Sequence, residues 1–223
     1  MNYNFKFSAL WPYMPEILSG VILTLQLASV AMLFGLAIGL AVAIGRVSSR
    51  PAIRMAARVY VEAIRNTPLL VQLFIVFFGL PSLGLRLGAN TAAVIALSIN
   101  LGAYSAEILR AGFESVRVGQ VEAGRSLGLT AAQTFRHVVL FPAIKAIYPA
   151  LASQFVLLML TTSVVSSIGV TELFGQAAFI DSRTYRSFEV YTLITLSYLV
   201  FTLGFRALFS AIYWAVFVRR SHR

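Results

Sequence analysis

Five long apolar stretches with uncharged central parts restrict what this chain can fold into more than any other feature. They lie near residues 17–45, 60–85, 87–110, 146–171 and 188–218. A helix needs about 20 apolar residues to cross the hydrocarbon core of a bilayer. Only 12% of the 223 residues are charged, about half the share typical of a soluble domain. The sequence therefore predicts an all-α integral membrane protein, with about five transmembrane helices in a single domain over residues 1–223.

The basic residues gather in three groups and indicate the orientation of the chain. Lys and Arg number 18 against 8 Asp and Glu. The groups lie in residues 46–58, 110–145 and 219–223, whereas residues 1–16 and 172–189 are near neutral. Since cytoplasmic loops are enriched in Lys and Arg, we expect the N-terminus outside and the C-terminus inside. This pattern explains the positive charge without nucleic acid as a partner. Residues 1–16 also lack the cleavage pattern of a signal peptide.

Several kinds of chemistry lack the residues they need. The chain has no cysteine and two histidines, His137 and His222, so thiolate and histidine metal sites are not expected. It contains no Gly-rich phosphate loop of the Walker type. The uncharged parts of the stretches contain no Asp, Glu, Lys or His, which disfavours coupling to an ion gradient. We therefore expect a protein that is not an enzyme and holds no cofactor of its own.

Uncharged polar residues within the stretches are candidates for a solute pathway. A buried amide or hydroxyl group is costly without a partner, so these side chains should face protein or water rather than lipid. Hydrogen bonds between helices are one interpretation, and a pathway lined by neutral groups for a polar solute is the other. A helix broken at a proline such as Pro68, Pro81 or Pro149 exposes backbone carbonyls to a cavity. The candidate pathway residues are Asn66, Thr67, Gln72, Asn100, Tyr104, Thr162 and Ser163, within a wider polar set that adds Gln154, Thr161 and Ser166.

Two short patterns predict contacts of the helices. Gly35 and Gly39 form a Gly-xxx-Gly step, which lets two helix backbones approach closely. Packing within the chain is the favoured interpretation, and a subunit interface is the alternative. Glu62 and Arg65 lie one helical step apart, so we expect a structural ion pair, with a gate at the inner mouth of the pathway as the alternative. Arg206 interrupts the fifth stretch and should snorkel or lie at a protein interface.

Residues 111–145 are too long and too structured for a simple connector between two spans. Glu107, Arg110 and Glu114 have helical spacing, so the third span should continue as a helix beyond the bilayer. We expect that helix to break at Val118–Gly119.

Two short helices are expected after the break. The first covers Glu122–Leu127 and ends at Gly128, as a helix with a C-capping glycine does. The second opens at a capping box formed by Thr130 and Gln133 and should end just before Pro142. A helix–glycine–helix unit of this kind either docks in a groove of another protein or lies as an amphipathic hairpin on the lipid surface.

Several motifs, in order along the chain, carry a family resemblance. They read GVILTLQL at residues 20–27, EAIRNTPLLVQL at 62–73, GAYSAEILRAG at 102–112 and SVRVGQVEA at 115–123. The overlapping EAGRSLG at 122–128, with Val138-Val139-Leu140 after it, resembles the EAA loop of ABC-importer permeases. Together the motifs are similar to those of the polar amino acid permease family, and they cover nearly the whole chain.

This resemblance implies the membrane permease subunit of an ATP-driven importer, which moves a polar amino acid inward by alternating access. Two such subunits, either two copies or two homologues, would pair in the bacterial cytoplasmic membrane. Separate ATPase subunits would bind ATP and Mg²⁺, and an extracytoplasmic binding protein would deliver the amino acid. The implied ATPase-coupling residues are Glu122, Ala123, Gly124, Arg125, Leu127 and Gly128. A gated channel with a regulatory loop and an ion-coupled carrier are the alternatives.

Three positions depart from the family pattern. Gly124 stands where the family usually has alanine, and Pro142 lies one residue later than the family's proline. In the fourth stretch, Leu160-Thr161-Thr162-Ser163 lacks the Lys-Asp pair that many members carry before Thr-Ser. The loss of that pair puts ion-pair gating at this position in doubt.

Overall fold

The chain folds into a bundle of long helices. The computed structural model describes residues 4–219, and no strand occurs among them. The α-helices are α1 (Met14–Arg46), α2 (Pro51–Arg65), α3 (Leu69–Phe74), α4 (Ala89–Glu114), α5 (Val118–Ser126), α6 (Ala131–Thr134), α7 (Leu140–Thr161), α8 (Leu173–Thr184) and α9 (Ser187–Tyr213). Shorter 3₁₀ or π segments are η1 (Phe7–Tyr13), η2 (Ile75–Gly79), η3 (Leu80–Leu83), η4 (Phe135–Val139), η5 (Thr162–Ile168) and η6 (Trp214–Val218).

Four continuous helical stretches of the described chain are long and apolar enough to cross a membrane. They are Phe7–Arg46, Ala89–Glu114, Ala131–Ile168 and Ser187–Val218. Helix α2 and the α3–η3 segment are together long and apolar enough for a fifth crossing, but they meet at an angle of 108°. The total is five if this bent pair counts as one span. This agrees with the prediction of about five spans in an all-α protein. Part of the predicted C-terminal basic group, Arg220 and Arg223, lies outside the described residues, as does His222.

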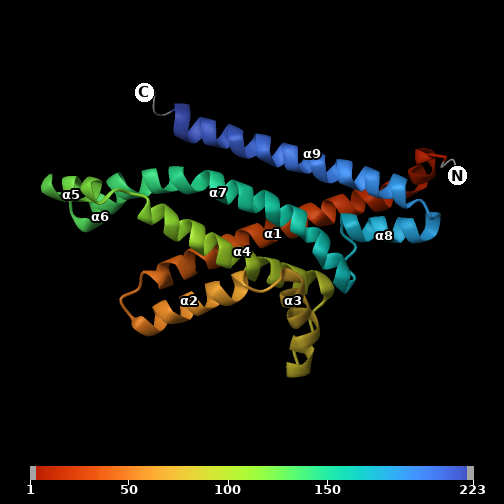
Figure 1. The fold of residues 1–223 in the computed structure, drawn as a ribbon, viewed down its shortest axis with the longest axis horizontal. Coiled ribbons are helices and arrows are strands. Elements are labelled where there is room, and N and C mark those ends of the chain that lie inside the picture. The colour runs from red at the N-terminus through yellow and green to blue at the C-terminus, as the bar shows by residue number, and fades with distance from the viewer. Residues whose placement is uncertain (1–3, 220–223) are drawn as a thin grey trace.

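The helices lie roughly along one long axis, with two distinct ends (Figure 1). The α5 end holds α5, α6 and the turn between α1 and α2, and the α8 end holds α8 and the start of α1. Helix α9 lies beside α7 on the outside of the bundle, while α3 points away from the long axis. Helix α8, which forms within the segment between the fourth and fifth spans, was not predicted from the sequence.

The helix that leads into the fourth span begins much earlier than predicted. We expected a short helix to end just before Pro142 and the span to begin near residue 146, but α6, η4 and α7 form one unbroken helical stretch from Ala131. The reason is the π-helical turn η4, which precedes Pro142. Such a turn shifts the hydrogen-bond pattern and so accommodates a proline that lacks an N–H.

The break after the third span also differs from the prediction. Helix α4 does continue to Glu114, as expected, but α5 already begins at Val118, so the break at Val118–Gly119 was wrong. The turn occupies residues 115–117, where the hydroxyl of Ser115 donates to the carbonyl of Gly112 at 2.7 Å. A serine side chain that bonds its own backbone competes with helix continuation.

Helices α1 and α4 make the most extensive helix contact in the described part of the chain, and glycines allow their close approach. A Cβ atom on Gly35 would lie 2.7 Å from Cδ2 of Leu101, and one on Gly39 would lie 2.6 Å from Cβ of Ser105. A Cβ atom on Gly102 of α4 would likewise lie 2.6 Å from Cγ2 of Ile38 on α1. The Gly-xxx-Gly step therefore packs within the chain, which confirms the favoured interpretation.

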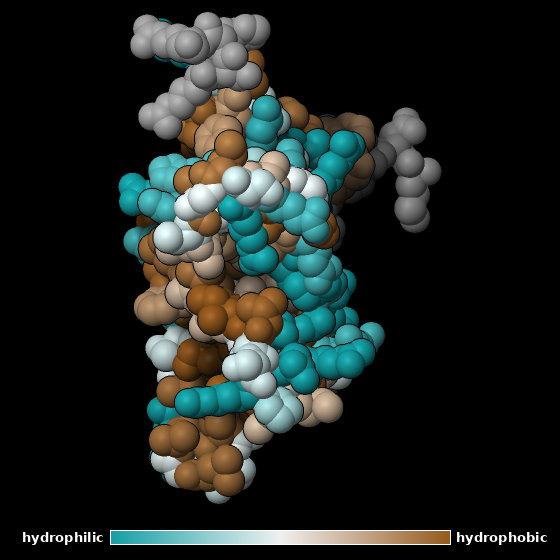
Figure 2. Space-filling model, turned by 90° about the vertical axis from the view of Figure 1, so that its left-hand side faces the viewer, coloured by the Kyte–Doolittle hydropathy of each residue, from teal (hydrophilic) through white to brown (hydrophobic). Residues whose placement is uncertain are grey.

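Large apolar side chains remain exposed along several helices. Examples are Leu33 of α1, Ile75 after α3 and Val200 of α9, which are 72%, 63% and 64% exposed. Figure 2, which faces the α5 end, shows hydrophobic surface next to a band of hydrophilic residues. An apolar surface of this extent is what lipid solvates.

Candidate functional site

The bend between α2 and α3 opens a break in the backbone of the second span. Pro68 has no N–H and disfavours a helical conformation at the residue before it, and it precedes the first residue of α3. Helix α2 ends at Arg65, with Asn66 as its C-cap. The carbonyl groups at this break need new hydrogen-bond donors, because the helix no longer supplies them.

Gln72 supplies those donors from the first turns of α3. Its Nε2 donates to the carbonyl oxygens of Ile64 at 2.8 Å and Thr67 at 3.0 Å, and lies 2.9 Å from the Thr67 hydroxyl. Its Oε1 accepts a hydrogen bond from Nδ2 of Asn100 on α4 at 3.0 Å. Since the Gln72 side chain is buried and its amide is fully engaged, it stabilises the bend and fixes the orientation of Asn100.

A polar cavity lies against this bend, between α2, α4 and α7. Its volume is about 430 Å³, within the range of small-molecule sites. The lining residues are Arg65, Asn66, Thr67, Pro68, Leu69, Asn100, Tyr104, Gln154, Leu157, Leu158 and Thr161. Among the described residues that line it, Arg65 alone is charged. The cavity therefore offers amide and hydroxyl groups, one guanidinium group and an apolar wall.

The structure brings together four of the seven predicted pathway residues. Asn66, Thr67, Asn100 and Tyr104 line the cavity, and Gln72 supports it from behind. Two others lie outside the lining. Thr162 is buried and donates to the carbonyl of Met159 at 2.7 Å, and Ser163 donates to that of Leu160 at 2.9 Å.

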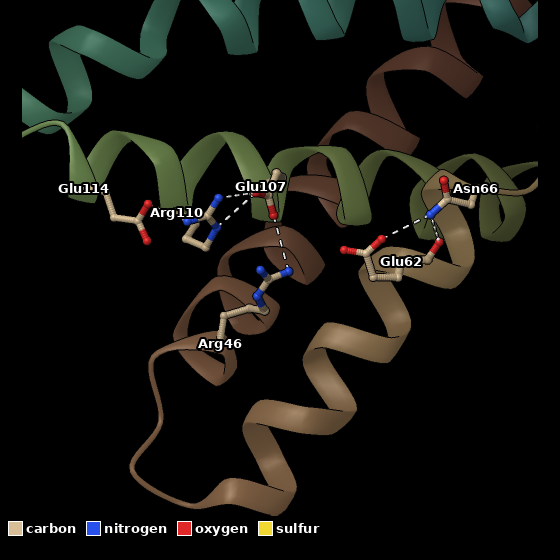
Figure 3. Close-up of polar contacts among 6 residues, drawn as sticks. All are labelled: Arg46, Glu62, Asn66, Glu107, Arg110 and Glu114. Carbon is tan, nitrogen blue, oxygen red and sulfur yellow. Dashed lines mark hydrogen bonds and ion pairs between the residues drawn. The ribbon is translucent and has the colours of Figure 1, made fainter.

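Arg65 was not among the predicted pathway residues, although it contributes to the cavity wall. Its guanidinium lies over the ring of Tyr104, 5.4 Å from the ring centroid. Glu62 accepts a hydrogen bond from Nδ2 of Asn66 at 3.2 Å (Figure 3). The described residues show no ion pair between Glu62 and Arg65, so the expected structural pair was wrong. Instead, the aromatic ring of α4 attracts the arginine.

Gln154 and Thr161 of α7 also line the cavity. Both residues belong to the wider polar set but were not among the seven predicted pathway residues. A signal was available, because both are polar and lie seven positions apart in a mostly apolar span, and therefore on one face of a helix.

The segment after α4 forms the predicted small helix and its glycine cap. Gly128 has a φ of +79°, which glycine adopts readily, and the amide of Leu129 donates to the carbonyl of Gly124. Thr130 and Gln133 form the predicted capping box. Leu127 is 82% exposed at the end of α5, so an exposed apolar side chain marks the tip.

Gly124 fixes how α5 sits on the start of the fourth span. It is buried, and a Cβ atom there would lie 3.2 Å from Val138 and 3.3 Å from Thr134. A methyl group at this position would fit only if these two side chains shifted by a few tenths of an ångström. The tight contact is consistent with glycine at a position where the family usually has alanine.

Charged residues connect α1 and α4 near the α5 end (Figure 3). Arg46 at the end of α1 lies 3.3 Å from Glu107 of α4. Arg110 pairs with Glu107 and also with Glu114, one turn further along α4. This row of alternating charges keeps the end of α1 against the part of α4 that leads to α5.

A buried carboxylate joins three helices at the α8 end. Glu172 caps α8 by accepting hydrogen bonds from the amides of Phe174 at 2.9 Å and Gly175 at 2.8 Å. It also accepts from the hydroxyl groups of Tyr198 on α9 at 3.0 Å and Thr24 on α1 at 3.4 Å. Burial raises the pKa of the Glu172 carboxyl above its ordinary value, although these hydrogen bonds act in the opposite direction.

Comparison of the sequence with known proteins gives consistent matches over almost the whole chain. Residues 14–218 match the family described as binding-protein-dependent transport system inner membrane component. The chain is 38% identical over 203 residues to the probable glutamine ABC transporter permease protein of Bacillus subtilis (strain 168), over 91% of this chain and 92% of that protein. It is 36% identical over 202 residues to the glutamine transport system permease protein of Escherichia coli (strain K12), over 90% and 92%.

Comparison of the fold gives a similar result. The crystal structure of an amino acid ABC transporter with histidines contains a chain that matches with a TM-score of 0.90 and 43% identity, over 96% of this chain and 100% of that chain. A chain of the MetNI methionine ABC transporter in an inward facing conformation matches with a TM-score of 0.77 and 22% identity, over 92% and 98%. At that identity the second match shows the fold alone.

Proposed function

Because the chain belongs to the family of binding-protein-dependent transport system inner membrane components and is a permease subunit of an amino acid ABC importer, we propose that it moves a polar amino acid inward by alternating access. Separate ATPase subunits bind ATP and Mg²⁺ and drive the change. One observation above all supports this proposal: the broken second span lies against a polar cavity between the helices. Discontinuous helices at mid-membrane are a recurring device for binding substrates.

The lining of the cavity suits a zwitterionic amino acid. The guanidinium of Arg65 can bind a carboxylate through parallel hydrogen bonds. Asn66, Asn100 and the Tyr104 hydroxyl offer acceptors to an ammonium group and donors to a polar side chain. Because Gln72 fixes the orientation of Asn100, one acceptor would be in place before the substrate arrives. The cavity is therefore the proposed substrate pathway, with Thr162 and Ser163 lying just beyond it.

Helix α5 is the proposed contact with the ATPase. Leu127 at its tip is exposed and apolar, and Glu122 and Arg125 lie exposed on the same short helix. Ala123, Gly124 and Gly128 keep the helix narrow enough to enter a cleft. A plug of this chemistry fits a groove in another protein, where an apolar anchor is buried and charged residues surround it.

The remaining arrangement follows from this assignment. The α5 end faces the cytoplasm, so the N-terminus lies outside and the C-terminus inside the bacterial inner membrane. An extracytoplasmic binding protein delivers the amino acid at the α8 end. A second permease subunit, identical or homologous, completes the translocation path. The clustering of arginines at the α1–α2 turn and of basic residues over residues 110–145 supports this orientation.

The transport assignment can be tested with the complete complex in proteoliposomes. Uptake of the amino acid should require ATP, and Asn100→Ala should reduce uptake and raise the half-saturating concentration. Ser197→Ala, which removes a half-buried hydroxyl of α9 that does not line the cavity, is the control and should transport normally. Gradient-driven uptake without ATP would support the ion-coupled carrier instead, and full activity of Asn100→Ala would remove the cavity from the pathway.

The contact with the ATPase can be tested with two matched arginines. Arg125 on α5 and Arg136 on η4 are both exposed near the same end of the molecule. Arg125→Ala together with Leu127→Ala should reduce amino acid-stimulated ATP hydrolysis while the permease stays in the membrane. Arg136→Ala should leave hydrolysis unchanged. Normal stimulation in the α5 variant would refute the proposed role of this helix.

A further inference from the structure

A second charged cavity lies at the turn between α1 and α2. Its volume is about 320 Å³, and it shares no lining residue with the polar cavity at the bend. The residues that line it are Arg46, Val47, Pro51, Arg54, Met55, Arg58, Arg110 and Glu114. Four of these eight side chains are arginines, and they come from three different helices or helix ends. The transport mechanism proposed above does not use this cavity.

The charges around the cavity are not balanced within the described residues. Arg46 and Arg110 pair with Glu107, and Arg110 also pairs with Glu114 (Figure 3). Arg54 and Arg58 form no ion pair in the described part of the chain. Two carboxylates therefore face four guanidinium groups. The remaining positive charge lies on α2, on one side of the cavity.

The spacing of Arg54 and Arg58 favours an anion bound between these two side chains and Arg110 of α4. Arg54 and Arg58 are four residues apart on α2, so their side chains lie on the same face and repel each other. A bound anion removes that repulsion. Guanidinium groups bind phosphate oxygens with paired hydrogen bonds, which makes a phosphate the anion that this set fits best.

The rest of the lining is apolar and exposed. Val47 is 71% exposed and Met55 is 59% exposed. Pro51, which lies between them in the sequence, is also an exposed lining residue. A free phosphate ion gains no binding energy from an apolar surface, whereas the acyl chains of a lipid can pack against it. The cavity also lies where the apolar helix α1 gives way to a charged turn, which is the level of lipid headgroups.

We propose that this cavity binds the phosphate headgroup of an anionic phospholipid. Arg54 and Arg58 hold the phosphate together with Arg46 and Arg110, and the acyl chains lie along Val47 and Met55. The bound lipid would cross-link the α1–α2 turn to α4.

The proposal can be tested on the full-length chain by native mass spectrometry with added lipid. Phosphatidylglycerol is the anionic probe, and phosphatidylcholine is the neutral comparison. Arg54→Gln with Arg58→Gln removes the two unpaired charges, and Arg58→Gln alone removes one. Arg136→Gln with Lys145→Gln removes two charges outside the cavity and serves as the control with the same net charge.

The wild-type chain and the control should bind phosphatidylglycerol in preference to phosphatidylcholine. The affinity for phosphatidylglycerol should fall about fivefold for each arginine removed from the cavity, since one basic residue near a membrane surface contributes about 1 kcal/mol. Equal affinity of the cavity variants and the control would overturn the proposal. Displacement of the lipid by millimolar inorganic phosphate would also overturn it, because the site would then bind the free anion.

Discussion

Gln72 offers the sharpest test of how the bent second span is held together. Its amide group bonds two backbone carbonyls and a hydroxyl at the break, and it accepts from Asn100 on α4. We expect Gln72→Met, which keeps the length of the side chain and removes its polar atoms, to destabilise the fold. A buried hydrogen bond contributes about 1 kcal/mol net, and a partner left unpaired costs about 1–3 kcal/mol more.

The size of the effect follows from the number of groups left without a partner. The two N–H groups of the Gln72 amide serve the carbonyls of Ile64 and Thr67, and its oxygen serves Asn100. Because Thr67 is exposed and lines the cavity, where water can replace a lost partner, we expect a loss of about 3 kcal/mol rather than the full sum. For a chain of this size that corresponds to a melting temperature lower by about 6–12 °C.

The assay is thermal unfolding of the purified chain in one lipid composition. Gln176→Met is the matched control, since Gln176 makes one longer hydrogen bond, to Ser19 at 3.3 Å; its melting temperature should change little. Combining Gln72→Met with Asn100→Ala should cost less than the sum of the two single changes, because both remove the same hydrogen bond. If Gln72→Met melts within about 1 °C of wild type, the bend is held by other contacts and the reasoning fails.

Three further predictions follow from other parts of the molecule. Gly39→Leu should destabilise the chain by about 1–3 kcal/mol, because a Cβ atom there lies 2.6 Å from Ser105; an unchanged melting temperature would contradict the close approach of α1 and α4. Glu172 has a raised pKa in the folded chain, so its contribution to stability is present below about pH 4.5 and is lost as the pH rises through the raised value. As the pH is raised, the melting temperature of Glu172→Gln should therefore fall less steeply than that of the wild-type chain. Arg65→Gln should raise the half-saturating amino acid concentration for stimulated ATP hydrolysis about tenfold, with Arg136→Gln as the control.

Local signals in the sequence predicted some elements correctly. The capping box at Thr130 and Gln133 and the glycine cap at Gly128 were correct because these motifs depend on a few neighbouring residues. The Gly-xxx-Gly packing of Gly35 and Gly39 was also correct. In each case the residue type itself sets the backbone conformation or the permitted distance.

Other features depend on contacts that no local pattern contains. Pro142 was read as the end of a helix, but the π-helical turn before it lets the helix continue. Glu62 and Arg65 have the spacing of an ion pair, yet Asn66 and Tyr104 are their partners. Asn66 competes locally for Glu62, four residues along the chain, whereas Tyr104 becomes the partner of Arg65 only when α2 and α4 pack together.

The unbroken course of the fourth span gives the proposed mechanism a physical route through the protein. Helix α5 packs against η4 through Gly124, whose neighbours are Thr134 and Val138. From there the same helical stretch continues through α7 to Gln154 and Thr161 in the cavity wall. A helix is stiff along its axis, so a displacement imposed at α5 would reach the wall of the cavity without an intervening loop. Had the helix ended before Pro142, as the sequence suggested, a flexible joint would have separated the proposed ATPase contact from the substrate pathway.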